Sequence, residues 1–303
     1  MAGFTEPDPT RYVLSDPALA ALPDDELFDP AALAALRDPD AAAASALARA
    51  EGAEQGARSI FSFPLLREGA CERLVREVEA YEAHCAARGR ANRGLLLRTR
   101  VVLSDVAPEL AELARRIVAA AQPLAAALLP PPPAPARGRR AAAAAATATE
   151  GSGWRLAPAH HAYVIRYSAA GPAEGEDRSL RCHTDDSDLT INVCIGREGW
   201  RGGALYFCPR PRPPSRPCTP DPAEEERLGA LARYAHGVGR AVIHDGAVYH
   251  GAEPLEAGAR WNLICWCMRD DAPWKREMYA SLETYLREKS ERAVLEVSAA
   301  GGS

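Results

Sequence analysis

The chain has 303 residues, a formal net charge of −5 and a mean hydropathy of −0.24. This length allows one large domain or two small ones with a sizeable core. The negative charge gives no general attraction to nucleic acid or to an anionic membrane, and no apolar run is long enough for a transmembrane helix. The N-terminal stretch "MAGFTEPDPTRYVLSDP" has no basic start or apolar block of the kind found in secretory signals. We therefore expect a cytoplasmic or nuclear protein with neither nucleic acid nor a membrane as its partner.

Cysteine usage supports a reducing compartment. The chain has 8 cysteines, and no two of them form a C-x-x-C pair. Most lie in apolar segments, where a free thiol behaves as a small hydrophobic group. We expect free thiols here, and neither a disulfide framework nor a zinc knuckle.

The N-terminal half is predicted to support a later domain. Residues 1–57 are rich in Ala, Asp and Pro and are expected to be largely irregular. Residues 58–128 are predicted to be a helical support segment: a short strand "SIFSFPLL" precedes two stretches whose apolar residues recur every three or four positions. The stretch "PPPPAPARGRRAAAAAATATEGSG" then marks 129–153 as a low-complexity insertion.

From residue 154 onward the sequence favours strands. "HHAYVIRYS", "LTINVCIG", "GGALYF", "GRAVIHDG" and "RWNLICWCM" are rich in β-branched and aromatic residues, and "LTINVCIG" alternates strictly. Short strands with tight turns favour a double-stranded β-helix of the jelly-roll, cupin-like type over 154–272. A short helix is expected near "RLGALARYAHG", and a C-terminal helix and tail over 273–303.

Two histidines and a carboxylate are the candidate metal ligands. His183 and Asp185 are two apart on extended backbone, so their side chains point to the same side. His250 follows a predicted strand and turn. Two imidazoles and one carboxylate form the facial triad of non-haem Fe(II) oxygenases. The neighbouring Asp186 and Asp188 are expected to stay solvated at the rim or to orient a ligand histidine.

Arg260 is the candidate anion-binding residue. It lies ten residues after His250 and opens an apolar strand. A guanidinium buried among apolar side chains needs an anion, and its planar fork suits a carboxylate bidentately. The carboxylate could belong to a dicarboxylic co-substrate such as 2-oxoglutarate, or to an Asp or Glu on a neighbouring strand.

These motifs together resemble a known family. "HTDDSDLTINVCIG", "WRGGALYF" and "GRAVIHDGAVYHGAEPLEAGARWNLICWC" are similar to the Fe(II)/2-oxoglutarate-dependent dioxygenase superfamily. Within it they resemble the prolyl 4-hydroxylase-like and collagen lysyl hydroxylase-like catalytic domains, especially the 2-oxoglutarate and iron-dependent oxygenase domain-containing type. Leu180 stands where prolyl hydroxylases often carry a tyrosine, and Arg260 replaces their lysine. These departures leave the substrate open.

The resemblance implies roles for individual residues. His183, Asp185 and His250 would hold Fe(II), and Arg260 would bind the distal carboxylate of 2-oxoglutarate. O2 would be a co-substrate and ascorbate a candidate reductant.

A hydroxyl or amide from a core strand is expected to complete the co-substrate site. The candidates are Tyr167, Tyr163, Thr190 and Asn192, of which Tyr167 and Asn192 are favoured.

The resemblance implies a hydroxylase that acts on an unactivated C–H and releases succinate and CO2. Its substrate would be a peptidyl prolyl-type or lysyl-type side chain or a small molecule. A cupin-like metal isomerase or a cofactor-free dioxygenase on the same architecture would not need Arg260. A non-catalytic jelly-roll scaffold, with "PRPRPPSRP" as a docking segment, would not bind iron. The oligomeric state stays open.

Overall fold

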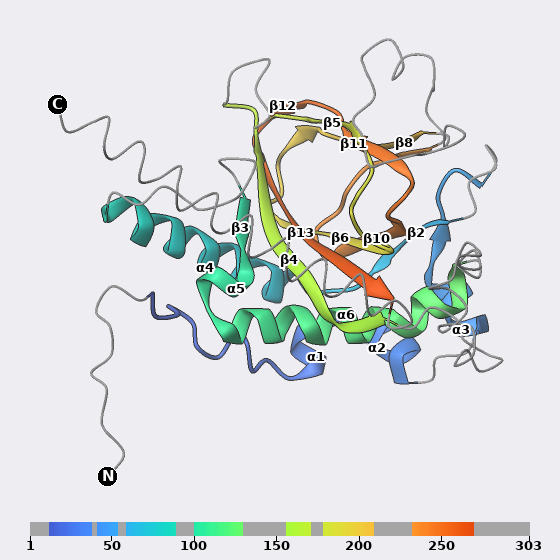
Figure 1. The fold of residues 1–303 in the computed structure, drawn as a ribbon, viewed down its shortest axis with the longest axis horizontal. Coiled ribbons are helices and arrows are strands. Elements are labelled where there is room, and N and C mark those ends of the chain that lie inside the picture. The colour runs from blue at the N-terminus through green and yellow to red at the C-terminus, as the bar shows by residue number, and fades with distance from the viewer. Residues whose placement is uncertain are drawn as a thin grey trace, which may run out of the picture.

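Two antiparallel sheets face each other and helices cover the outside of the larger one (Figure 1). The computed structural model of the chain describes residues 12–37, 41–53, 59–88, 100–129, 156–170, 178–208 and 232–269. The C-terminal helix and tail predicted over 273–303 lie outside these residues, as does the low-complexity insertion except for Leu129.

The larger sheet has seven strands in the order β1-β2-β10-β6-β13-β4-β3, and each neighbouring pair is antiparallel. Its strands are β1 (Arg49–Ala50), β2 (Ile60–Pro64), β3 (Arg100–Val102), β4 (Leu156–Ser168), β6 (Leu189–Gly196), β10 (Arg240–Asp245) and β13 (Ala259–Arg269).

The smaller sheet has four strands in the order β5-β11-β8-β9, and a two-stranded ribbon pairs β12 with β7. These strands are β5 (Leu180–His183), β7 (Arg201–Gly202), β8 (Leu205–Cys208), β9 (Ala232–Tyr234), β11 (Tyr249–Ala252) and β12 (Leu255–Ala257).

The path of the chain between the sheets is that of a jelly roll. From β4 onward it passes to β5 in the small sheet, returns to β6, crosses to β8 and β9, returns to β10, crosses to β11 and ends in β13. Two four-stranded layers made in this way, β10-β6-β13-β4 and β5-β11-β8-β9, form the double-sheet arrangement that removes most free edges. The predicted fold class is confirmed.

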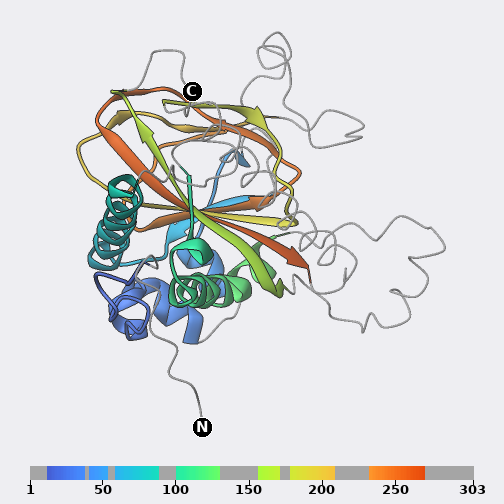
Figure 2. The same cartoon turned by 60° about the vertical axis from the view of Figure 1, so that its left-hand side comes forward.

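Six helices are described. They are α1 (Asp24–Leu27), α2 (Pro30–Arg37), α3 (Ala41–Leu47), α4 (Glu68–Ala87), α5 (Leu103–Val106) and α6 (Pro108–Leu128). The two long ones, α4 and α6, coincide with the predicted amphipathic stretches and lie beneath the large sheet, on the side opposite the small sheet (Figures 1 and 2). None of the described helices combines the length and apolar character that a membrane crossing requires.

The large sheet separates two apolar cores. Its outer face packs against α4 and α6, and its inner face packs against the small sheet. On β6, Leu189, Ile191 and Val193 belong to the outer core, while Thr190 and Asn192 alternate with them and face the small sheet. The polar side chains of the sheet are thus directed into the jelly roll.

Two expectations differ from the structure. Within 1–57, expected to be largely irregular, the described residues form α1, α2, α3 and β1, and Leu19, Leu27 and Phe28 are buried in the outer core. These helices are too short to show a periodic apolar pattern in the sequence. Tertiary packing of single apolar side chains in the outer core stabilises them instead. In the stretch expected to form a helix near "RLGALARYAHG", residues Ala232–Tyr234 instead form β9, because they pair with β8.

Candidate metal centre

The paired strands β5 and β11 bring the two candidate histidines together. His183 and His250 are direct partners in the antiparallel register, and their ring centroids are 4.5 Å apart. Asp185 follows β5 by two residues, with Oδ1 3.4 Å from Nε2 of His183 and Oδ2 3.5 Å from Nε2 of His250. One ligand atom from each residue lies within 4.8 Å of the others. The structure therefore brings together all three residues that the sequence pattern selected.

Backbone carbonyl groups fix which nitrogen of each imidazole faces the centre. Nδ1 of His183 lies 2.9 Å from the carbonyl oxygen of Arg181, and Nδ1 of His250 lies 3.0 Å from that of Val248. Since a carbonyl oxygen can only accept, both Nδ1 atoms carry a hydrogen, and Nε2 of each ring is the nitrogen that faces the centre and can bind a metal when the ring is neutral. Neutral imidazoles oriented in this way are prepared metal ligands.

Asp185 is buried, and one hydrogen bond holds its carboxylate while another holds its backbone. Thr190 donates its hydroxyl proton to Oδ2 over 2.5 Å, and the Asp185 backbone N–H donates to the carbonyl oxygen of Gly246 over 2.9 Å. Burial would raise the pKa of Asp185, but the adjacent His250 and His183 outweigh it and lower this pKa. Burial lowers the pKa of His250 to about 3. The centre thus offers one anionic oxygen ligand and two imidazole nitrogens, a donor set that fits a divalent iron ion.

The other two acids of the motif have separate roles. Asp186 is exposed, as predicted for a rim residue. Oδ2 of Asp188 accepts the backbone N–H of Arg269 over 2.9 Å and so holds the end of β13.

Arg260 is buried, and two of the three nitrogens of its guanidinium already donate hydrogen bonds. Its exposed fraction is 1%. Nε donates to Oδ1 of Asn262 over 2.9 Å and Nη1 donates to the carbonyl oxygen of Gly203, while Nη2 is buried without a partner. Among the ion pairs of the described residues none includes Arg260, so the alternative of a protein carboxylate partner finds no support there.

This geometry refines the expected bidentate contact. With Nε and Nη1 engaged, only Nη2 of Arg260 remains wholly free for a ligand. A buried cationic donor without a partner is costly, and a carboxylate is the group that best satisfies it. The orphaned Nη2 therefore fits one end of a dicarboxylic co-substrate, and the ligand would need additional donors.

Gly203 is required for this approach. Its φ is +71°, a conformation that favours glycine. A Cβ atom there would lie 2.7 Å from Cδ2 of Leu255 and 3.1 Å from Nη1 of Arg260. The Gly-Gly pair that precedes β8 thus makes room for the guanidinium.

Tyr167 lies beside the guanidinium of Arg260. It is the partner of Arg260 in the β4–β13 register, and its ring lies 5.1 Å from Cζ of Arg260. Burial raises the pKa of Tyr167, Arg260 partly opposes this, and the charge of Asp185 adds to the rise. Its hydroxyl is therefore protonated and can donate to an anion.

The other candidates have different surroundings. Asn192 is buried, and its Oδ1 accepts from Nδ2 of Asn262 over 2.7 Å. Tyr163 carries Arg100 stacked on its ring at 4.1 Å, and Thr190 is bonded to Asp185.

Three polar residues at the site were not selected from the sequence. Asn262 and His236 are buried beside Arg260, and His244 is buried with its ring 4.4 Å from that of His250. A signal existed for Asn262, which is two residues after Arg260 on the same strand and so shares its face. His236 lies in a loop and His244 lies on β10. Neither has a sequence pattern that links it to Arg260 or His250, because these contacts form only in the folded chain.

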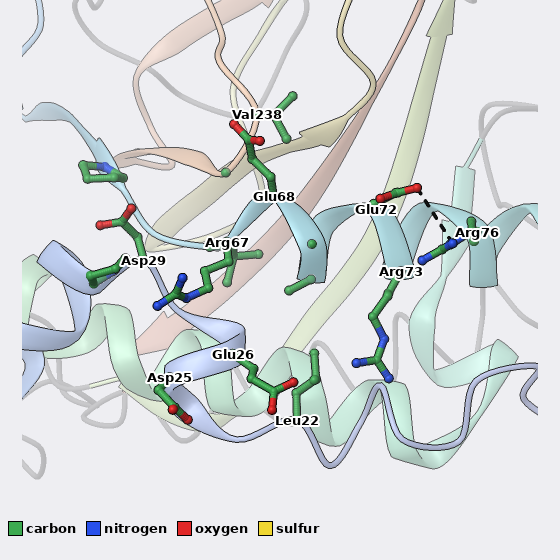
Figure 3. A pocket seen from close by; sticks show the side chains of 16 residues that line it. Leu22, Asp25, Glu26, Asp29, Arg67, Glu68, Glu72, Arg73, Arg76 and Val238 are labelled. Atoms are coloured by element: carbon green, nitrogen blue, oxygen red, sulfur yellow. Dashed lines mark ion pairs between the residues drawn. The ribbon is translucent and has the colours of Figure 1, made fainter.

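A separate hollow of about 870 Å³ lies on the helical side of the molecule (Figure 3). Acidic and basic side chains alternate around it, and one of the pairs, Arg76 and Glu72, is 3.8 Å apart. None of its lining residues belongs to the metal centre or contacts Arg260. The hollow is therefore separate from the candidate metal centre inside the jelly roll.

Comparisons with known proteins agree with the motif analysis. No family model matches the chain. A Homo sapiens protein named "2-oxoglutarate and iron-dependent oxygenase domain-containing protein 2" is 33% identical over 232 residues, which cover 75% of this chain and 54% of that protein. An Arabidopsis thaliana protein named "2-oxoglutarate and iron-dependent oxygenase domain-containing protein ICU11" is 37% identical over 111 residues, 36% of this chain and 24% of that protein. The chain spans about half the length of the vertebrate relatives.

A solved structure of prolyl 4-hydroxylases from Phytophthora capsici aligns with a TM-score of 0.45 and 14% identity, covering 88% of this chain and 78% of that one.

Proposed function

Since the chain is a homologue of the 2-oxoglutarate and iron-dependent oxygenase domain-containing proteins, we propose that it is an Fe(II)- and 2-oxoglutarate-dependent dioxygenase. It would hydroxylate an unactivated C–H of a peptidyl prolyl-type or lysyl-type side chain or of a small molecule, and release succinate and CO2. The observation that carries this proposal is the convergence of His183, Asp185 and His250, with both Nε2 atoms free to bind a metal.

His183, Asp185 and His250 would hold the iron. Bound Fe(II) supplies the redox chemistry that lets O2 attack a C–H bond, and the protein supplies orientation and shielding. Three protein ligands leave coordination positions open for co-substrate and oxygen. The carbonyl groups of Arg181 and Val248 keep the imidazoles aimed at the metal position.

Arg260 and its neighbours would bind 2-oxoglutarate. Nη2 of Arg260 would donate to the distal carboxylate, and the protonated hydroxyl of Tyr167 would lie along the ligand between this point and the metal. Oδ1 of Asn192 is occupied by Asn262, which leaves the amide hydrogens of Asn192 for the ligand. These side chains are buried inside the jelly roll, where charge interactions are stronger than in water.

The test is succinate formation by the purified chain with Fe(II), 2-oxoglutarate, O2 and ascorbate, with peptide and metabolite pools as substrates. His183→Ala and Asp185→Ala should each abolish succinate formation, because each removes a metal ligand. His84→Ala on α4 and Asp186→Ala, the exposed neighbouring acid, are matched controls that should retain it. Wild-type turnover in either ligand variant would refute the assignment.

The same experiment separates the enzyme from a non-catalytic jelly-roll module. Such a module would bind no Fe(II) and form no succinate with any substrate. An isomerase-like metal enzyme would bind metal but would be indifferent to 2-oxoglutarate and to Arg260→Met.

A further inference from the structure

Asn262 joins two buried side chains that each have an unused hydrogen-bond donor. Its Oδ1 accepts from Nε of Arg260 over 2.9 Å, and its Nδ2 lies 3.1 Å from Nε2 of His236. Nη2 of Arg260 and Nδ1 of His236 are both buried without a partner. Other buried nitrogens in the described residues also lack a partner, but these two belong to side chains that are both hydrogen-bonded to the amide of Asn262.

The hydrogen-bond directions in this group follow from its chemistry. A guanidinium can only donate, so the oxygen of the Asn262 amide must face Arg260. Nδ2 of Asn262 then donates to Oδ1 of Asn192 and to Nε2 of His236. Because Nε2 of His236 accepts, Nδ1 must carry the hydrogen of the neutral ring. Burial and the nearby Arg260 hold the pKa of His236 well below its usual range, which agrees with a neutral imidazole.

The two unused donors belong to side chains that are bonded to the two ends of the same amide. In a planar guanidinium Nε and Nη2 share one edge, so Asn262, bonded to Nε, flanks Nη2 as well. The imidazole of His236 is bonded to the other half of that amide. A buried donor without a partner costs free energy, and one carboxylate has enough lone pairs to accept from both.

We propose that Nδ1–H of His236 is a second donor, together with Nη2 of Arg260, for the distal carboxylate of the co-substrate. This inference rests on the proposed function, since it assigns a further residue to the same site. A carboxylate would then accept one hydrogen bond from Arg260 and one from His236, although Nε and Nη1 of Arg260 already donate within the protein. His236 and Arg260 would together select a 2-oxo acid that ends in a second carboxylate.

The test measures binding, not turnover, to the full chain loaded with Mn(II), which replaces iron without redox chemistry. Two ligands are titrated calorimetrically: 2-oxoglutarate, and 2-oxopentanoate, which has the same chain length but ends in a methyl group. His236→Phe should weaken the affinity for 2-oxoglutarate by about tenfold to a hundredfold, which is the effect of one hydrogen bond to a charged group. The affinity for 2-oxopentanoate should not change. His236→Gln, which keeps an N–H donor, should recover much of the affinity, and His84→Phe should change neither ligand.

The outcomes distinguish the two levels of the proposal. If the wild-type protein binds neither ligand, the proposed function fails. The role of His236 alone fails if the wild-type protein binds 2-oxoglutarate and His236→Phe binds it equally well. The role fails in the same way if His236→Phe loses affinity for both ligands by the same factor.

A measurement on the wild-type protein covers the case in which His236→Phe does not fold. In Zn(II)-loaded protein with 15N-labelled histidine, 2-oxoglutarate should shift the Nδ1–H signal of His236 and slow its exchange with water. 2-Oxopentanoate should do neither. An Nδ1–H signal that responds alike to both ligands would overturn the inference.

Discussion

Thr190 and Asp185 connect the two sheets at the metal centre. Thr190 lies on β6 of the large sheet and donates to Oδ2 of Asp185, which follows β5 of the small sheet. Since a carboxylate oxygen only accepts, the Thr190 hydroxyl hydrogen is committed to Asp185, and Ser187, 2.9 Å away, must donate to Thr190 in turn. The rotation of the carboxylate is therefore fixed by a hydroxyl chain.

Thr190→Val should weaken metal binding by about tenfold to a hundredfold, the usual effect of losing a group that orients a metal ligand. Valine keeps the shape of threonine but removes the hydroxyl, so Asp185 loses its partner. Mn(II) affinity, followed by electron paramagnetic resonance, is the measurement. Thr190→Ser keeps the hydroxyl and is the control; equal affinity in the Val and Ser variants would show that the bond does not orient the carboxylate.

Gly251 allows β5 and β11 to approach closely beside His250. A Cβ atom there would lie 2.4 Å from the hydroxyl oxygen of Tyr206 and 2.6 Å from the carbonyl oxygen of Leu180. Gly251→Ala should therefore force the two strands apart, lower the free energy of unfolding by about 1–3 kcal/mol and weaken metal binding. Urea unfolding and Mn(II) titration measure the two effects.

Gly69→Ala is the matched control for this substitution. Gly69 lies in the first turn of α4, and a Cβ atom there would meet nothing within 4 Å. Because alanine favours a helix, this variant should be as stable as the wild type or up to about 1 kcal/mol more stable. Unchanged metal binding in Gly251→Ala would mean that the strands accommodate the methyl group without moving His183 from His250.

The pairing of His183 with Asp185 and the role of Arg260 could be predicted from the sequence because their signals are local, whereas His250 was linked to them by the wider motif. His183 and Asp185 follow from period-two geometry, and Arg260 was selected because a cation opens an apolar strand. The long helices α4 and α6 followed from apolar residues at three-to-four spacing.

The network around Arg260 could not be predicted in the same way. It depends on β13 lying between β4 and β6 and on a loop residue, His236, reaching Asn262. Such contacts are set by strand register over long sequence distances, which no local pattern reports. For the same reason the sequence predicts a helix around β9, although the alternating burial of β9 matches a strand that pairs with β8.

Tyr12 and Glu77 attach the N-terminal segment to α4, and their contact predicts a pH effect. The Tyr12 hydroxyl donates to Oε1 of Glu77 over 2.5 Å, and Glu77 is buried. Burial, together with this hydrogen bond to Glu77, raises the pKa of Tyr12 to about 12.

Because the folded-state pKa of Tyr12 exceeds the unfolded value of about 10, the contribution of this contact is complete below pH 10 and is lost as the pH approaches 12. Tyr12→Phe should therefore be less stable than the wild type at pH 8, and the difference should shrink between pH 10 and 12. Urea unfolding of both proteins at several pH values is the measurement. A difference that does not change with pH would show that the Tyr12 proton is not involved.

The buried cysteines predict low thiol reactivity in the native state. Seven cysteines are described, and all are buried; Cys218 lies outside the described residues. Burial raises the pKa of Cys71 and Cys265 to about 12 and that of Cys194 to about 11. The thiolate is the reactive form, so these three residues should stay unmodified by iodoacetamide at pH 8 until the protein unfolds.

Mass spectrometry of the alkylated peptides measures each cysteine separately, with urea-unfolded protein as the fully reactive reference. Cys71 packs between α4 and the large sheet, whereas Cys265 lies on the central strand β13, so the two report on different parts of the outer core. Modification of Cys71 alone would mean that α4 opens locally without global unfolding. Modification of all three at the rate of a free thiol would contradict the packing of the helices against the sheet.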